Sequence, residues 1–145
     1  MKQIENYIDS LVKKIKEDSV FDECVFVKGF SALEFPNPNT SYMIAVSTLD
    51  STVSVEFCSD NVGEDLSGSI FNSTVKFRVY SKKNEGGDGL LALCTSLCDV
   101  IRKNDNENML TGITISSIAF DNDAMTVYRD VVASLSFCLY EEVKR

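Results

Sequence analysis

The sequence predicts an α+β fold, in which a mostly antiparallel β-sheet carries two helices packed on one face in the order α-β-β-β-β-α-β-β. Two segments have apolar residues at helical spacing, and six shorter or alternating apolar runs are typical of strands. Most connections between those runs are of hairpin length, which favours antiparallel pairing. Because 145 residues, 44% of them hydrophobic, can bury a substantial core, we expect one domain over residues 1–145.

An amphipathic helix is expected close to the N-terminus. Its apolar residues recur at positions i, i+3, i+4 and i+7, and they are Ile4, Tyr7, Ile8, Leu11, Val12 and Ile15. Lys13 and Lys14 fall on the opposite side of the helical wheel. We therefore expect the apolar stripe to pack on the sheet and the charged side to face water.

A first strand is predicted over residues 24–30, where the apolar run CVFVKGF occurs. Pro36 and Pro38 follow it and are the only prolines of the chain. Each proline restricts its own backbone and that of the preceding residue to extended or turn conformations. This segment is therefore interpreted as one rigid connection within the domain.

The middle of the chain combines a predicted hairpin, a loop and a long strand. Residues 42–49 and 52–57 are rich in strand-forming side chains and are separated by Asp50-Ser51, which predicts a hairpin. The polar, acidic stretch 58–69 predicts a loop. Apolar and polar residues alternate over 70–81, which predicts a central strand.

The last part of the chain begins with a polar, glycine-rich turn that leads into a second helix over 90–103, with Asp88 as the expected N-cap. A strand over 113–120 is expected to be interrupted at Ser116-Ser117. The final strand, 126–141, is the longest. Its alternation places on one face Val131, Ala133, Leu135, Phe137 and Leu139.

Composition excludes several chemistries. The 14 basic and 22 acidic residues give a formal charge of −8, and there is no histidine. Histidine-dependent catalysis and histidine-ligated metals are therefore excluded, and the acidity argues against specific nucleic-acid binding. No apolar run is long enough for a membrane span, so we expect a cytoplasmic protein without membrane contact. No carboxylate pair has a buried context, and we expect no enzymatic activity.

The five cysteines form an odd set without CxxC spacing: Cys24, Cys58, Cys94, Cys98 and Cys138. We interpret them as small buried hydrophobic residues of a reducing compartment. Cys94 and Cys98 are one helical turn apart, but they lie on the apolar stripe of the second predicted helix and have no further ligand cluster. The sequence therefore predicts neither a metal site nor a cofactor.

Two polar segments are candidates for binding. The acidic stretch with Asp60, Glu64 and Asp65 could contact a partner, and Lys82 and Lys83 precede a GGDG turn that could hold an anion. That turn matches neither of the glycine-rich phosphate-binding motifs. These five residues are the predicted contacts, and no catalytic or metal-binding residue is predicted.

The order of the elements resembles the tail terminator, or tail-completion, proteins of long-tailed phages and phage-tail-like bacteriocins, of the minor tail protein U type. The resemblance extends over nearly the whole chain. It depends on the opening helix and on the segments that follow it. These are the Phe35-Pro36-Asn37-Pro38 stretch before a strand at 42–46, the strand 75–81 with the glycine-rich turn, the helix 90–101, the strand 113–118 and the closing strand 128–141.

The resemblance implies a non-catalytic structural protein of a virion or tailocin tail, assembled in the cytoplasm of a bacterial host. It implies a homo-oligomer, a hexameric ring that sits on the last ring of the tail tube protein. Such a ring stops tube polymerisation and docks the head or neck, with sheath proteins as further partners. The acidic segment that contains Asp60, Glu64 and Asp65 would then face the lumen or a partner.

Two alternatives stay open. Neck and head–tail adaptor proteins, together with other tail-associated proteins, share much of this layout. In a different class, a monomeric cytoplasmic domain could bind a small ligand in a cleft between sheet and helix, using the GGDG turn.

Overall fold

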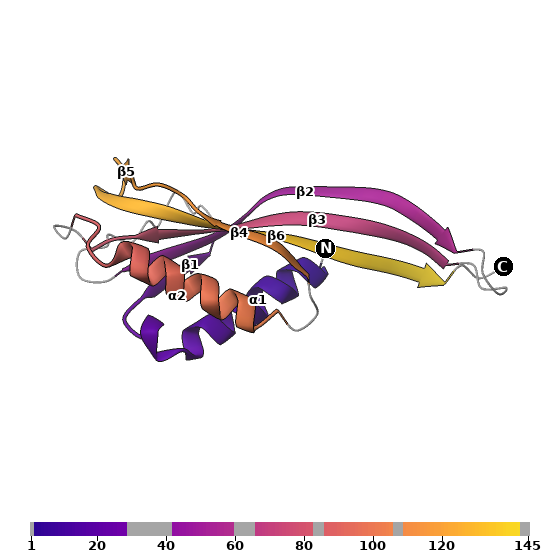
Figure 1. Cartoon of the computed structure of the whole chain (residues 1–145), viewed down its shortest axis with the longest axis horizontal. Helices are drawn as coiled ribbons and strands as arrows, with labels where there is room; N and C mark the ends of the chain where they lie inside the picture. The colour runs from indigo at the N-terminus through magenta and orange to yellow at the C-terminus, as the bar shows by residue number, and fades with distance from the viewer. Residues whose placement is uncertain (1, 29–41, 60–65, 83–85, 106–108, 143–145) are drawn as a thin grey trace.

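Two helices and a short 3₁₀ helix pack on one side of a six-stranded sheet (Figure 1). The computed structural model describes residues 2–28, 42–59, 66–82, 86–105 and 109–142. Its helices are α1 (Lys2–Glu17), the 3₁₀ helix η1 (Ser19–Phe21) and α2 (Leu90–Lys103). Its strands are β1 (Val25–Lys28), β2 (Met43–Ser59), β3 (Leu66–Tyr80), β4 (Leu110–Ile115), β5 (Ala119–Asp121) and β6 (Thr126–Glu142). The predicted α+β class is confirmed.

The sheet has the order β1-β2-β3-β6-β4, and β5 pairs with the first residues of β6. Only β1 and β2 are parallel, and every other pair is antiparallel. β3 lies between β2 and β6, and it pairs with β6 without a shift in register from Leu66 opposite Glu142 to Tyr80 opposite Tyr128. These three long strands form the backbone of the fold.

The predicted hairpin at Asp50-Ser51 is wrong, because β2 continues through these two residues as one strand of 17 residues. The register shifts between Thr48 and Ser51, so an irregularity of the β-bulge type absorbs the turn-forming sequence within the strand. The predicted loop over 58–69 is wrong at its two ends, since 58–59 and 66–69 belong to β2 and β3. Residues 60–65 lie outside the described residues.

Other boundaries follow the sequence pattern more closely. The predicted interruption at Ser116-Ser117 is confirmed, because it separates β4 from β5, and both strands pair with β6. The first strand begins at Val25, one residue after the predicted start, and Gly29 and Phe30 lie outside the described residues. Asp88 is not the N-cap of α2, since that position is taken by Gly89, at φ 76°, without a side-chain cap. The Phe35–Pro38 segment lies outside the described residues.

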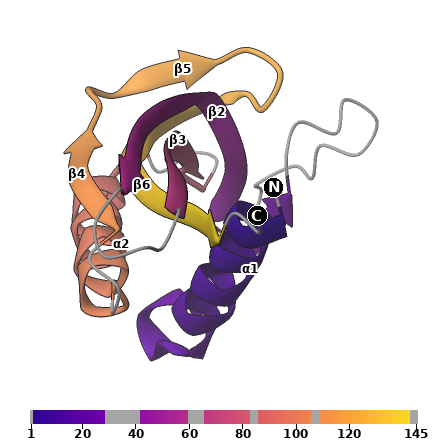
Figure 2. The ribbon, with the colours of Figure 1, turned by 90° about the vertical axis from the view of Figure 1, so that its right-hand side faces the viewer.

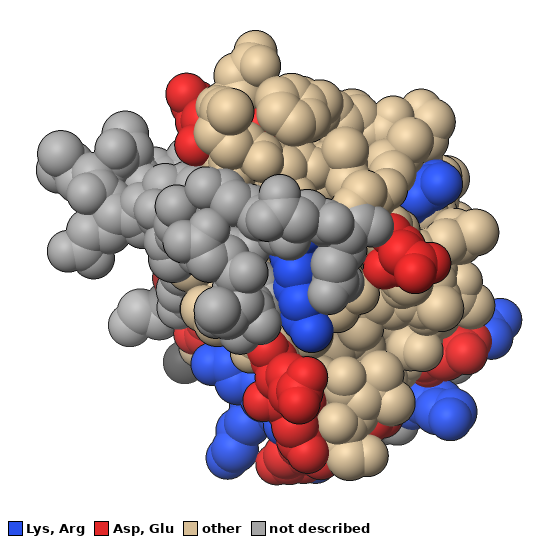
Figure 3. All heavy atoms as spheres, turned by 90° about the vertical axis from the view of Figure 1, so that its left-hand side faces the viewer, with Lys and Arg blue, Asp and Glu red and all other residues tan. Residues whose placement is uncertain are grey.

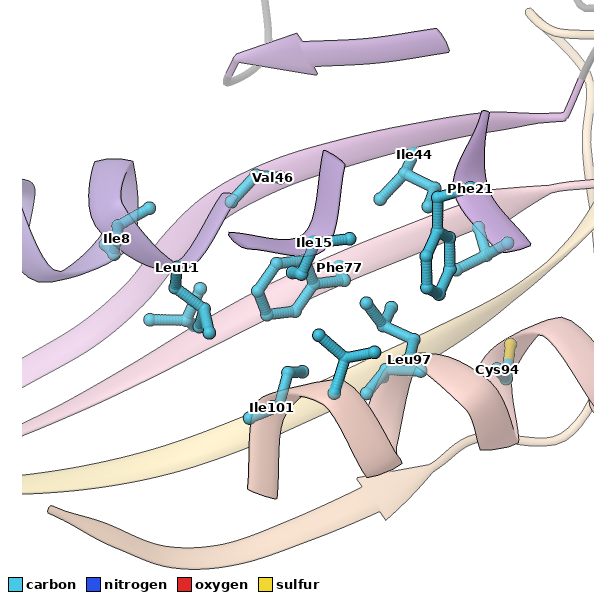
Figure 4. Packing of buried hydrophobic residues seen from close by; sticks show 14 of the residues in the cluster. Ile8, Leu11, Ile15, Phe21, Ile44, Val46, Phe77, Cys94, Leu97 and Ile101 are labelled. Atoms are coloured by element: carbon cyan, nitrogen blue, oxygen red, sulfur yellow. The ribbon is translucent and has the colours of Figure 1, made fainter. Parts of the chain in front are cut away.

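The core lies between the two helices and one face of the sheet, as predicted (Figure 4). Ile8, Leu11 and Ile15 of α1 and Leu97 and Ile101 of α2 converge on this face. The strands supply Ile44, Val46, Phe71, Val75, Phe77, Val79, Val131, Leu135 and Phe137. Odd-numbered residues of β3 and β6 therefore face the helices, and Phe77 is fully buried beneath them.

The far halves of β2, β3 and β6 extend past both helices (Figure 1). Tyr7 of α1 contacts Phe137 edge to face, with ring centroids 5.6 Å apart, close to the point where the strands leave the helices. We call the part beyond it the arm: residues 54–59 of β2, 66–70 of β3 and 138–142 of β6. Seen from the arm end, its three strands are strongly curved (Figure 2). Among the described residues, the arm is a single three-stranded layer.

Replacing Phe77 with Ala tests the position of the core. We expect Phe77→Ala to lower the free energy of unfolding by about 3–5 kcal/mol, because it removes a buried ring and leaves a cavity. Urea denaturation monitored by circular dichroism measures this loss. Leu91→Ala, at a side chain of α2 that is 53% exposed, is the control and should change the same quantity by less than about 0.5 kcal/mol. Equal losses for the two variants would contradict the assigned core.

Candidate interaction surfaces

Of the five predicted contact residues, the structure describes Lys82, which follows the end of β3. Asp60, Glu64, Asp65 and Lys83 lie outside the described residues. The predicted contacts other than Lys82 therefore stay predictions.

Lys82 is half-buried beside Tyr42, with its ammonium group 5.1 Å from the centre of that ring. The Tyr42 hydroxyl in turn donates a hydrogen bond of 3.0 Å to the backbone carbonyl of Asp88. These contacts fasten the start of β2 to the turn before α2. Lys82 thus has a place in the packing of the domain.

The GGDG turn has a structural explanation. Gly86, Gly87 and Gly89 all have positive φ, a conformation that side chains other than glycine adopt at a cost. A Cβ atom added at Gly87 would lie 2.5 Å from Cδ1 of Ile118. The glycines are therefore required by the backbone path and, at Gly87, by close packing.

The described thiols are held in their protonated form. Burial, and then the neighbouring Cys98, raise the pKa of Cys94 to about 12. Burial raises the pKa of Cys98 and also that of Cys24, the latter to about 11. Reactive or metal-binding cysteines need an accessible thiolate. In the described part of the chain, no three Cys, Asp or Glu residues lie close enough together to hold a metal ion.

A polar cluster that the sequence did not predict lies on the sheet face opposite the helices. Arg78 of β3 and Asp130 of β6 form a two-pronged ion pair, with N–O distances of 2.8 and 3.1 Å. The guanidinium carbon also lies 4.1 Å from the centre of the Tyr128 ring. The hydrogen bonds to Asp130 raise the pKa of Arg78, and the cation stays fully charged. Both charges are thus engaged within the sheet.

On the same face of the sheet, a hydrogen bond connects β3 to the turn that follows β5. The Tyr80 hydroxyl donates a 3.0 Å hydrogen bond to Asp121, which also accepts from the backbone N–H groups of Asp123 and Ala124. Partial burial acts to raise the pKa of Asp121, but these hydrogen bonds and the charge of Arg78 outweigh it and hold the pKa below 3.8. The cluster therefore has the character of a structural clamp.

A groove of about 360 Å³ lies between α1 and the first two strands. Its apolar lining comes from Ile8, Val12, Phe26, Val27 and Val46, and its charged lining from Asp9, Lys13 and Lys16. The ammonium group of Lys16 lies 5.4 Å from the centre of the Phe26 ring. Lys13 was predicted to face water, and Lys16 was not predicted to belong to any site. Their spacing of three residues, which places both on one side of a helix, was the available signal.

An apolar patch is exposed at the end of the molecule opposite the arm. It consists of Ile118, Phe120 and Met125, in and around β5, with exposed fractions of 44%, 54% and 60%. Figure 3 shows uncharged atoms gathered on the upper side of this end, where β5 lies in Figure 1. β5 has only three residues and, among the described strands, pairs with β6 alone.

Comparison with known proteins adds no family assignment: no family model matches the chain, and no curated protein matches it significantly. Within the described residues, no helix is both long and apolar enough to cross a membrane.

Acidification tests the Asp121 clamp. Because the folded-state pKa lies below the ordinary value of 3.8, the unfolded chain binds more protons in acid and the contribution of Asp121 is complete above about pH 5. It is lost as the pH falls below 3.8 through the folded-state pKa. We expect wild type to be more stable than Asp121→Asn at pH 6 and the difference to shrink toward pH 2.5, in urea titrations at each pH. A constant difference would contradict the assigned hydrogen bonds.

Breaking the Arg78–Asp130 pair tests the second half of the cluster. We expect Asp130→Asn to cost about 2 kcal/mol of unfolding free energy, because it leaves a mostly buried guanidinium without its charged partner. The control is Asp99→Asn in the solvent-exposed Asp99–Arg102 pair, where the expected loss is below about 1 kcal/mol. Thermal or urea unfolding at neutral pH compares the two. If Asp130→Asn lowers the unfolding free energy no more than Asp99→Asn does, the Arg78–Asp130 pair does not stabilise the fold as assigned.

Proposed function

We propose that this chain is a structural subunit that assembles with copies of itself into a closed ring, as a tail terminator does. In this proposal the ring caps a tail tube of a phage or tailocin, stops its polymerisation, and offers its other side to a head or neck. The role is non-catalytic. Its partners are further copies of the chain and the tube protein.

The arm is the observation that carries this proposal. It extends beyond the helices that cover the rest of the sheet (Figure 1), and in the described chain it is a single layer of three paired strands. Its outer strands, 54–59 of β2 and 138–142 of β6, also have one edge each without a strand partner in the described chain. Exposed strand edges readily pair with another chain, so a projecting arm of this kind is suited to assembly.

The composition is compatible with such a ring. The chain has a net charge of −8, and an acidic lumen would repel DNA that passes through it. The titratable groups with shifted pKa values also favour a structural role. Cys24, Cys94 and Cys98 are kept protonated by burial, and Arg78 and Asp121 are engaged in the clamp.

Light scattering of the purified chain tests whether it forms a ring. At micromolar concentration we expect a particle of about 100 kDa, roughly six times the 16.1 kDa of one chain, because a closed cyclic assembly has a fixed copy number. Negative-stain images should show rings. A second measurement adds the protein to polymerising tube protein from the same genome, where tubes should stop growing. A persistent monomer that leaves tube growth unchanged would contradict the proposal, and rings that bind only a neck protein would favour the adaptor alternative.

Shortening the arm tests its part in assembly. The variant replaces residues 56–68 with Asn-Gly, which joins the paired residues Val55 and Ser69 by a two-residue turn, and ends the chain after Cys138. We expect monomers with nearly unchanged thermal stability, because the core around Phe77 is intact. Phe120→Ser, which alters the exposed patch at the other end, is the control and should leave the particle mass unchanged. Rings formed by the arm-shortened variant would show that the arm is not needed.

A further inference from the structure

We propose that the groove between α1 and β1 is the docking site for the arm of a second copy of this chain. The inference rests on the proposed function, since it names the contact by which a ring would be built. It assigns one occupant to the groove, and it follows from charge, chemistry and the direction of the arm.

The two surfaces have opposite charge. The arm, residues 54–59, 66–70 and 138–142, contains three acidic residues, Glu56, Glu141 and Glu142, and no lysine or arginine. The groove is bordered by Lys13 and Lys16, and among the described residues Asp9 is its only acidic lining residue. Lys14 and Glu17 form their own ion pair, at 3.8 Å, on the same helix. The excess negative charge of the arm thus meets a groove with an excess of positive charge.

The groove and the arm also match in that both contain apolar residues. The groove is floored by Ile8, Val12, Phe26 and Val46, so its occupant needs apolar side chains beside its acidic ones. The sequence of the arm combines both kinds, as in Leu139-Tyr140-Glu141-Glu142 at the end of β6. By register, Glu142 pairs with Leu66 at the outermost row of the arm. Acidic residues are therefore present where an inserted arm would end.

The backbone next to the groove can accept a strand. β1 is the edge strand of the sheet, and among the described residues it pairs only with β2. Phe26 and Val27 of β1 line the groove, so a segment lying there would run beside that edge. Strand addition to an exposed edge supplies main-chain hydrogen bonds that do not depend on sequence, while the neighbouring pocket supplies selectivity.

An arm that lies in this groove comes from another molecule. The arm runs away from α1 and β1, and its three paired strands hold it in that direction (Figure 1). An arm on one copy and a groove on the next form a contact between two different surfaces. Repeated by a rotation that closes, such a contact builds a ring, and repeated by one that does not close, it builds a filament.

Charge reversal on each side tests this contact. One variant carries Lys13→Glu and Lys16→Glu, and the other carries Glu141→Lys and Glu142→Lys. Each alone should be monomeric in sedimentation velocity at concentrations where wild type assembles, because like charges then face each other. A mixture of the two should assemble again, since each surface now meets its complement. Restored assembly cannot be explained by misfolding of either variant.

A matched control has the same change in charge elsewhere on the two helices. Lys14→Glu with Lys103→Glu reverses two lysines that do not line the groove and should assemble as wild type does. Wild-type assembly by both test variants, or failure of the folded pair to assemble on mixing, would overturn the docking proposal while leaving the proposed function in place. A monomeric wild type would overturn both. Open filaments in place of rings, with restored assembly on mixing, would support the contact and contradict the terminator function.

Discussion

The unbroken pairing of β3 with β6 is the constraint on which the rest of the structure depends. Side chains alternate between the two faces of a strand, so a slip of one residue would exchange every buried residue for an exposed one. The observed register places Phe77 and Val131 under the helices and aligns Arg78 with Asp130 on the other face. The apolar core and the polar clamp therefore specify the same register independently, and together they hold the strands that continue into the arm.

The class and most elements could be predicted because their signals are local. Helical spacing marked α1 and α2, and alternation marked β3 and β6, with Val131, Ala133, Leu135 and Phe137 on the buried face as expected. The hairpin prediction failed at Asp50-Ser51 for a non-local reason. Those residues favour a turn, but pairing with the continuous strand β3 keeps β2 extended and absorbs the extra residue in a bulge. The start of β3 was missed likewise, because Ser67 and Gly68 have low strand propensity and gain their conformation from neighbours on both sides.

The candidate surfaces were less predictable than the fold. Lys82 was predicted from its place beside a glycine-rich turn, but its contact in space is the ring of Tyr42, a residue 40 positions earlier in the chain. The groove combines Lys16 with Phe26, and the clamp joins residues 52 positions apart, so neither could be found from spacing alone. The sequence does show that the segments of the arm contain Glu56, Glu141 and Glu142 and no lysine or arginine. This absence of positive charge gains a meaning once the topology shows that the three segments lie side by side.

The position of β6 as the last strand has a consequence for synthesis of the chain. β3 forms early, but its partner emerges from the ribosome only after α2, β4 and β5 have been made. Until then β3 has β2 as its only long neighbour, and one edge of each arm strand is open to other nascent chains. Pairing over such long sequence separations is slow in folding, so these edges stay unpaired for longer than the edges of a local hairpin would. The chain therefore exposes unpaired strand edges before its own sheet is complete.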